Sequence, residues 1–112
     1  LYFTSRRPWE DGASNGFKDP MLNHYSEDIY QASLADNDGW NSPSRMDMCK
    51  PQFNEASVSV SIDERRVYTY NDKKGNGDIY YSDLKNGSFT PIAPIGKSGI
   101  NTETRWETHY TV

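Results

Sequence analysis

The chain has 112 residues, the size of one ordinary domain, and its 12 Lys and Arg against 16 Asp and Glu give a net charge of −4. It has no basic excess to attract a nucleic-acid backbone, and no stretch approaches the ~20 apolar residues of a membrane-spanning helix. Leu, Ile, Val and Phe make up only 18 residues, but eight Tyr and three Trp add large rings that bury well. The composition predicts an all-β, aromatic-rich protein with a thin core, without nucleic-acid binding or membrane insertion by this segment.

Three strands are expected in the first half of the chain, at residues 1–5, 28–33 and 40–46, because these stretches are rich in aromatic and branched side chains. The long segment between the first two, residues 6–27, reads as an inserted loop. Since the sequence opens on Leu1 within strand-like residues, we expect it to be a piece of a longer protein.

The second half of the chain shows a more regular strand pattern. Apolar residues alternate with serines from Ala56 to Ile62, the period of two expected for a half-buried strand. Asn86-Gly87 is typical of a hairpin turn, and the prolines that follow it suit an edge strand. Strands are therefore expected at residues 55–61, 66–71, 78–83 and 89–95, and a further strand begins at 107–112.

Part of the sequence repeats. Asp28-Ile29-Tyr30 recurs 50 positions later as Asp78-Ile79-Tyr80, and Glu55–Val60 matches Glu107–Val112 at an offset of 52. Leu1–Thr4 matches Val67–Tyr70 at an offset of 66, and the loop 6–27 accounts for the difference. Periods of roughly 40–50 residues with four strands each are typical of propeller blades.

The repeat predicts antiparallel four-stranded blades of a β-propeller, about two in number. Residues 1–54 would be a partial blade with strands 2–4, residues 55–106 a complete blade and its connection, and residues 107–112 the first strand of the next. Closed propellers use about 4–8 blades. We therefore expect the rest of the ring to come from a longer parent or from another chain.

The repeated segments resemble a known family. Leu1 to Arg7 followed by Glu27-Asp28-Ile29-Tyr30 is similar to the TolB-type, WD40-like propeller repeat. Residues 61–66 and 77–82 resemble it again, although Ile62 stands where Pro is usual and Glu64 where Gly is usual. This resemblance implies that Asp28, Tyr30, Asp63, Asp78 and Tyr80 are framework residues of the blades.

A narrower resemblance rests on residues 75–82, 100–102, Trp106-Glu107 and the insertion 6–27. Together they are similar to the propeller of Bacteroidetes envelope proteins of the OmpA family, among them the PorE-type lipoproteins of type IX secretion and gliding. The resemblance implies a periplasmic, outer-membrane-associated protein whose partners are other envelope or secretion-system proteins. Nothing in the sequence resembles the OmpA-like part itself.

Motifs for phosphate or calcium binding are incomplete. Gly96-Lys97-Ser98 lacks the Gly that a phosphate loop needs five residues earlier, where Pro91 stands. Residues 36–39 begin like a calcium loop, but Asp47 occupies the twelfth position in place of Glu. A hairpin turn is the better interpretation of residues 36–39.

No catalytic set is evident either. His24 and His109 lack metal-ligand spacing, and Cys49 has no Cys-His-Asn context around it. The serines of residues 57–61 have no nucleophile elbow. We therefore expect neither enzymatic activity nor a metal or other cofactor.

The loop 6–27 is the candidate for partner contact, since loops longer than about 12–15 residues are usually functional or disordered. Its aromatic and basic residues are typical of interface anchors. The alternative is that the loop folds over its own blade and covers the thin core. The candidate contact residues are Arg7, Trp9, Phe17, Met21 and Tyr25, and the loop 71–77 lies in a second possible binding position.

The sequence thus favours a noncatalytic propeller scaffold that binds other proteins. Two alternatives stay open. One is a glycan- or peptide-binding propeller of a nutrient-uptake system, in which Trp9, Trp40 and Trp106 would stack on sugar from one exposed face. We instead expect Trp40 and Trp106 to pack within strands. The other is the propeller of a serine peptidase, which requires a hydrolase domain elsewhere in a longer parent.

Overall fold

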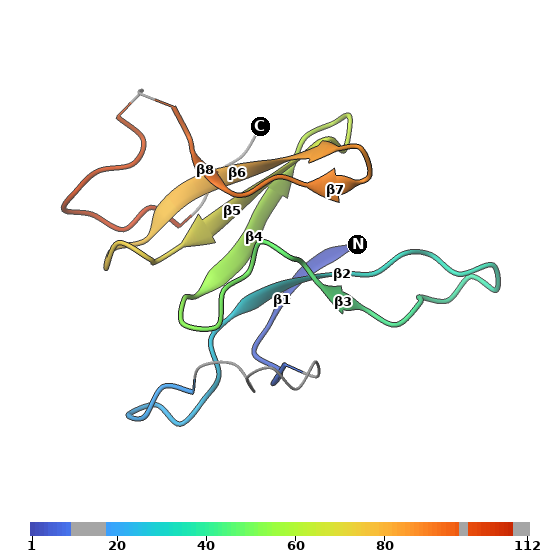
Figure 1. Cartoon of the computed structure of the whole chain (residues 1–112), viewed down its shortest axis with the longest axis horizontal. Coiled ribbons are helices and arrows are strands. Elements are labelled where there is room, and N and C mark those ends of the chain that lie inside the picture. The colour runs from blue at the N-terminus through green and yellow to red at the C-terminus, as the bar shows by residue number, and fades with distance from the viewer. Residues whose placement is uncertain (10–17, 97–98, 109–112) are drawn as a thin grey trace.

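The computed structural model describes residues 1–9, 18–96 and 99–108, and this part of the chain is all β, with two antiparallel sheets and no helix (Figure 1). There is accordingly no helix in the described residues that could cross a membrane. The expected all-β antiparallel architecture is confirmed. The eight strands are β1 (Tyr2–Ser5), β2 (Asp28–Gln31), β3 (Ser44–Arg45), β4 (Glu55–Val60), β5 (Arg66–Asn71), β6 (Asp78–Lys85), β7 (Ser88–Phe89) and β8 (Ala93–Pro94).

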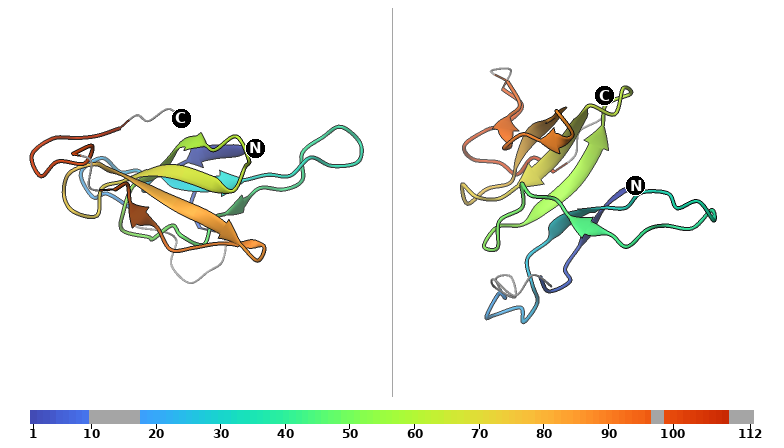
Figure 2. Two further views of the ribbon diagram at one scale, coloured as in Figure 1. Left: turned by 90° about the horizontal axis from the view of Figure 1, so that it is seen from above. Right: turned by 45° about the vertical axis from the view of Figure 1, so that its right-hand side comes forward.

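The strands form two sheets that stand side by side (Figures 1 and 2). The first has the order β1-β2-β3, and the second has the order β4-β5-β6-β7, with β8 pairing with β6 farther along that strand. In β4 the register shifts between Ser57 and Ser59, so the ladder with β5 contains a bulge. Ser57 N also donates to Thr4 Oγ1 of β1, and the two side-chain hydroxyls are in hydrogen-bond contact, which joins the sheets at this point.

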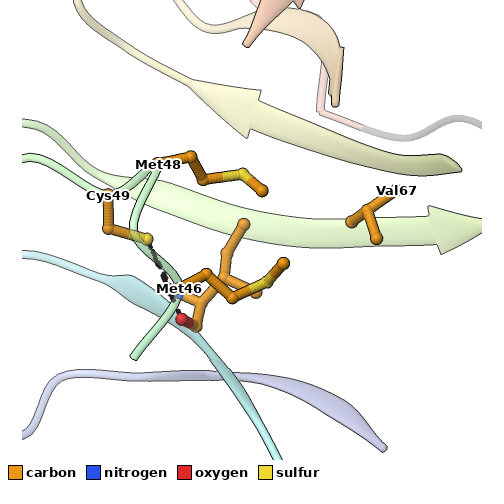
Figure 3. Close-up of a cluster of buried hydrophobic side chains, with 5 residues drawn as sticks. Met46, Met48, Cys49 and Val67 are labelled. Carbon is orange, nitrogen blue, oxygen red and sulfur yellow. Dashed lines mark hydrogen bonds between the residues drawn. The ribbon is translucent and has the colours of Figure 1, made fainter. Parts of the chain in front are cut away.

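The core lies between the two sheets. Tyr2 and Phe89 meet edge to face across it, with ring centroids 6.1 Å apart. Figure 3 shows the labelled side chains between β2 and the strands of the second sheet. The buried cluster consists of Ile29, Met46, Met48, Cys49 and Val67, with Tyr2, Val60, Phe89 and Ile92 packed at its margin.

The internal repeat is visible in the strand pairing. β1-β2-β3 and β5-β6-β8 have the same order. The β1-β2 and β5-β6 registers agree residue for residue at the sequence offsets of 66 and 50, and β3 corresponds to β8 at an offset of 49. Thr4 faces Ile29 as Tyr70 faces Ile79. After the third strand, Met46 N donates to Ile29 O and Ile95 N to Ile79 O. We call β1-β2-β3 unit A and β5-β6-β8 unit B.

Several expected strand limits are wrong. Of residues 40–46 only Ser44–Arg45 form a strand, and Trp40 makes an isolated bridge with Leu34 at the base of a turn. The expected strand 89–95 is split into β7 and β8 because Pro91, between them, has no amide hydrogen to donate. Residues 107 and 108 are not in a strand, and residues 109–112, His109 included, lie outside the described residues.

Two expected packing positions are also wrong. Trp40 and Trp106 lie outside the named strands and are more than half exposed. Ile62 is fully exposed, because β4 ends at Val60 and the alternation runs on into the turn before β5. The turn at residues 36–39 is confirmed: Ala35 N donates to Gly39 O, and Asp38 adopts a positive φ of 61°.

Candidate functional site

The most unusual chemical group in the described residues is a buried cluster of Asp28, Cys49 and Glu55. One potential ligand atom of each lies within 4.8 Å of those of the other two. All three residues are at most 2% exposed. Asp28 opens β2, Glu55 opens β4, and Cys49 belongs to the connection between β3 and β4, so the cluster lies where unit A meets the second sheet.

Asp28 is only partly satisfied. Its Oδ2 accepts a 2.7 Å hydrogen bond from Trp9 Nε1, whereas its buried Oδ1 has no hydrogen-bond partner within residues 1–9, 18–96 and 99–108. The Arg45 guanidinium stacks on the Trp9 ring, 3.3 Å from its centroid. Burial raises the pKa of the Asp28 carboxyl, and the Trp9 hydrogen bond and the Arg45 charge offset only part of that rise.

The Glu55 carboxylate is hydrogen-bonded to β5 and to the connection between β3 and β4. Its carboxylate accepts from Asn71 Nδ2 (2.8 Å) and, at longer range, from Lys50 N (3.3 Å). Burial, with a smaller contribution from the nearby charge of Asp28, raises the pKa of Glu55 to about 8. At neutral pH the side chain is therefore largely protonated.

Cys49 binds the backbone of Ile29. Its Sγ accepts from Ile29 N at 3.3 Å and donates to Ile29 O at 3.8 Å (Figure 3). Burial raises the pKa of the thiol to about 12, so Cys49 is a neutral thiol and not a ready nucleophile.

Unit B contains an equivalent arrangement with one substitution. Asn101 takes the place of Cys49, with Nδ2 donating to Ile79 O (2.7 Å) and Oδ1 accepting from Ile79 N (2.8 Å). Glu107 corresponds to Glu55 and accepts from Thr102 N as Glu55 accepts from Lys50 N. The Asp, the Glu and the residue between them are thus recurring parts of the fold.

The loop 71–77 approaches this arrangement closely. Trp106 stacks on Tyr70, with ring centroids 6.3 Å apart, and both rings cover Gly77. A Cβ at Gly77 would lie 2.1 Å from the Tyr70 ring, so no larger residue fits there without movement. The corresponding position in unit A is Glu27, whose side chain forms an ion pair with Arg6.

A cavity of about 460 Å³ extends to one side of the cluster. Apolar groups such as Phe53 and Phe89 form much of its wall, and Glu55 and Asn71 reach it from the cluster. Of the three residues of the cluster, Glu55 is the one that lines the cavity.

The two ends of the candidate contact loop 6–27 differ in what they contact, and the first end packs on its own unit. Arg7 lies over the rings of Phe3 and Tyr30, 4.7 Å from the second centroid, and Trp9 is held by Asp28. These two residues cover their own unit, as the alternative interpretation of the loop predicts. Phe17 lies outside the described residues.

The far end of the same loop forms a small hairpin that points into solvent. Lys18 bridges to Tyr25, and the Asp19 carboxylate accepts from Met21 N (2.8 Å) and Leu22 N (2.9 Å). These hydrogen bonds lower the pKa of Asp19 and fix the turn. Met21 is 92% exposed and Leu22 65% exposed, so the hairpin presents two apolar side chains.

The predicted framework residues occupy structural positions. Tyr30 and Tyr80 are buried in the centres of β2 and β6, and Asp78 opens β6 within reach of Lys74 Nζ (3.8 Å). Asp63 organises the turn between β4 and β5, accepting from Ser61 Oγ and Arg65 N.

Comparison of the chain with protein-family models, with curated proteins and with solved structures gives no match. The sequence interpretation missed Cys49 and Glu55, since neither lies in a recognised motif. The available signal was the offset of 52 that aligns Glu55 with Glu107 and, with it, Cys49 with Asn101.

Proposed function

We propose that this chain is part of a β-propeller that acts as a noncatalytic protein-interaction scaffold in a bacterial envelope protein. The observation that carries the proposal is the second occurrence of one three-stranded unit. Units A and B share strand order, register and the contacts that fasten the following connection to the central strand. Such repetition is typical of radially repeated blades.

The hairpin of residues 18–25 supplies the contact surface in this proposal. Its turn is fixed by Asp19 before a partner arrives, which lowers the entropy cost of binding. Met21 is a flexible, polarisable side chain suited to protein contacts, and Leu22 lies beside it. The envelope location and the secretion-system partners rest on the sequence resemblance alone.

Neither alternative gains a supporting observation. The glycan-binding alternative needs the tryptophans on one exposed face, but the segments that contain Trp40 and Trp106 lie at opposite ends of the molecule in two views (Figures 1 and 2). Trp9 is occupied by Asp28 and Arg45. The peptidase alternative depends on a domain beyond these residues.

The test is photocrosslinking in the cell that makes the protein. A photoreactive residue is placed at Met21 of the full-length protein and, as a control, at the equally exposed Ile62 in the turn between β4 and β5. We expect one defined envelope protein to crosslink at position 21 and not at position 62. Equal crosslinking at both positions, or none at position 21, would refute contact through the hairpin.

A further inference from the structure

We propose that Asp28, Cys49 and Glu55 form a binding site for a divalent, thiophilic metal ion, with Zn²⁺ the best match. The cluster offers one sulfur and two carboxylate groups from three separate elements, brought together by the fold. This inference goes beyond the scaffold function and does not depend on it.

The donor set selects the metal. Zn²⁺ accepts both thiolate and carboxylate ligands, whereas Ca²⁺ and Mg²⁺ prefer oxygen alone. Three protein ligands leave a fourth tetrahedral position for water. The cavity of about 460 Å³ reaches the cluster at Glu55 and supplies both that water and a route for the ion.

The distances are compatible with binding after a small adjustment. In a tetrahedral zinc site with bonds of about 2.0–2.3 Å, ligand atoms lie about 3.5 Å apart. The ligand atoms of the cluster lie within 4.8 Å of one another. Binding therefore requires the ligand atoms to approach one another by at most about 1.3 Å.

The unpartnered Oδ1 of Asp28 is an independent indication of a ligand. It is buried in a residue only 1% exposed and has no hydrogen-bond partner among the described residues. The equivalent Asp78 Oδ1 of unit B is also unpartnered, but there no thiol completes a set of metal ligands and Lys74 Nζ lies 3.8 Å from the same carboxylate. Leaving a buried carboxylate oxygen unpaired is costly, and a cation is the partner that it lacks.

Binding of the ion requires the thiolate form of Cys49 and the carboxylate forms of Asp28 and Glu55. Uptake of the metal should therefore release protons, and its affinity should fall as the pH is lowered.

The comparison with unit B shows that Cys49 is not the best residue for the backbone contact alone. Asn101 makes two hydrogen bonds of 2.7 and 2.8 Å to Ile79, whereas the contacts of Cys49 with Ile29 are 3.3 and 3.8 Å. In unit B, Asp78 also has Lys74 Nζ beside it at 3.8 Å. The thiol is thus the feature that distinguishes unit A as a metal site.

The test is cobalt substitution in the full-length chain, purified and stripped with a chelator. Titration with Co²⁺ should give the near-ultraviolet thiolate-to-cobalt absorption and the visible bands of a tetrahedral site at one ion per chain. Stoichiometric Zn²⁺ should abolish both. Cys49 is the only cysteine of this chain, so the thiolate absorption reports on it directly.

Three variants complete the experiment. Cys49→Asn copies the arrangement of unit B and should remain folded, with unchanged circular dichroism, while losing the thiolate absorption. Asp28→Asn should weaken Zn²⁺ binding at least tenfold, and the matched Asp78→Asn should leave the affinity unchanged. Absence of the thiolate absorption in the wild-type chain, its survival in Cys49→Asn, or equal effects of the two Asp variants would overturn the proposal.

Discussion

Units A and B are two solutions to the same structural problem, and they differ where their central strand meets the connection that follows. In unit B the contact is made by an amide with two short hydrogen bonds to Ile79, beneath stacked aromatic rings. In unit A a thiol makes two longer contacts beside two buried acids. The backbone pairing is the same in both units. The two units therefore differ in the side chain at this position, a thiol in unit A and an amide in unit B, and the same fold accommodates either one.

The largest effect should come from the two equivalent isoleucines near the start of β2 and β6. Ile29 and Ile79 are both fully buried, but only Ile29 belongs to the apolar cluster between the sheets. We expect Ile29→Ala to lower the free energy of unfolding by about 3–4 kcal/mol and Ile79→Ala by about 2–3 kcal/mol. Urea denaturation of both variants measures the difference, and a larger loss for Ile79→Ala would contradict the placement of the core.

The second comparison uses pH. The folded pKa of Glu55 is about 8, above the ordinary value of 4.5 for a glutamate side chain, so between these values the folded state binds more protons than the unfolded state. Its stability contribution is therefore complete below pH 4.5 and is lost as the pH rises through 8. We expect a loss of roughly 2–4 kcal/mol over this window, measured by denaturation with a chelator present.

Glu55→Gln is the control for that experiment, because the amide copies the protonated acid and can still accept from Asn71. Its stability should be nearly flat between pH 5 and 8. A slope equal to that of the wild-type chain would assign the pH dependence to other groups.

The third comparison exchanges the two connecting residues for alanine. Asn101→Ala leaves the buried N–H and C=O of Ile79 without their side-chain partners and should cost about 2 kcal/mol. Cys49→Ala removes weaker contacts and a small volume, and about 1 kcal/mol is expected. Thermal unfolding of the metal-free variants gives the ranking. The reverse order would mean that the thiol contributes more than its contacts indicate.

The smallest effects concern Gly77 and its counterpart Glu27. Gly77→Ala places a methyl group against Tyr70 and Trp106 and should cost about 1–2 kcal/mol, with a change in Trp106 fluorescence. Glu27→Ala removes only a partly exposed ion pair with Arg6, so less than about 1 kcal/mol is expected. An equal cost for both would show that the aromatic pair moves aside easily.

The sequence predicted the regular parts of this fold and missed the parts that depend on long-range contact. Six-residue strands such as Glu55–Val60 can be predicted from the alternation of apolar and polar residues and from the turn residues that flank them. The two-residue strands β3, β7 and β8 do not, because their pairing is decided by the neighbouring strand. Trp40 and Trp106 were misplaced for the same reason: hydrophobicity alone does not tell a packed ring from an exposed one.

Sequence motifs could not predict the candidate site, because its three residues belong to separate elements of the fold and form no local pattern. Asp28 was expected to be a framework residue, and in the structure its carboxylate accepts a hydrogen bond from Trp9. Its meeting with Cys49 and Glu55 depends on the connection between β3 and β4, whose path no local pattern specifies. Only the internal alignment of Glu55 with Glu107 pointed toward it.

The unequal connections of the two units set the order in which the molecule assembles. Ser5 and Asp28 are separated by 22 residues, whereas Asn71 and Asp78 are separated by 6. Closing the longer loop costs about 1 kcal/mol more in chain entropy, which slows the pairing of β1 with β2. The β5-β6 hairpin should therefore form first and serve as the template on which unit A folds. Pulsed hydrogen exchange during refolding should protect the amides of Thr69 and Tyr80, which face each other across β5 and β6, before those of Phe3 and Tyr30, which face each other across β1 and β2.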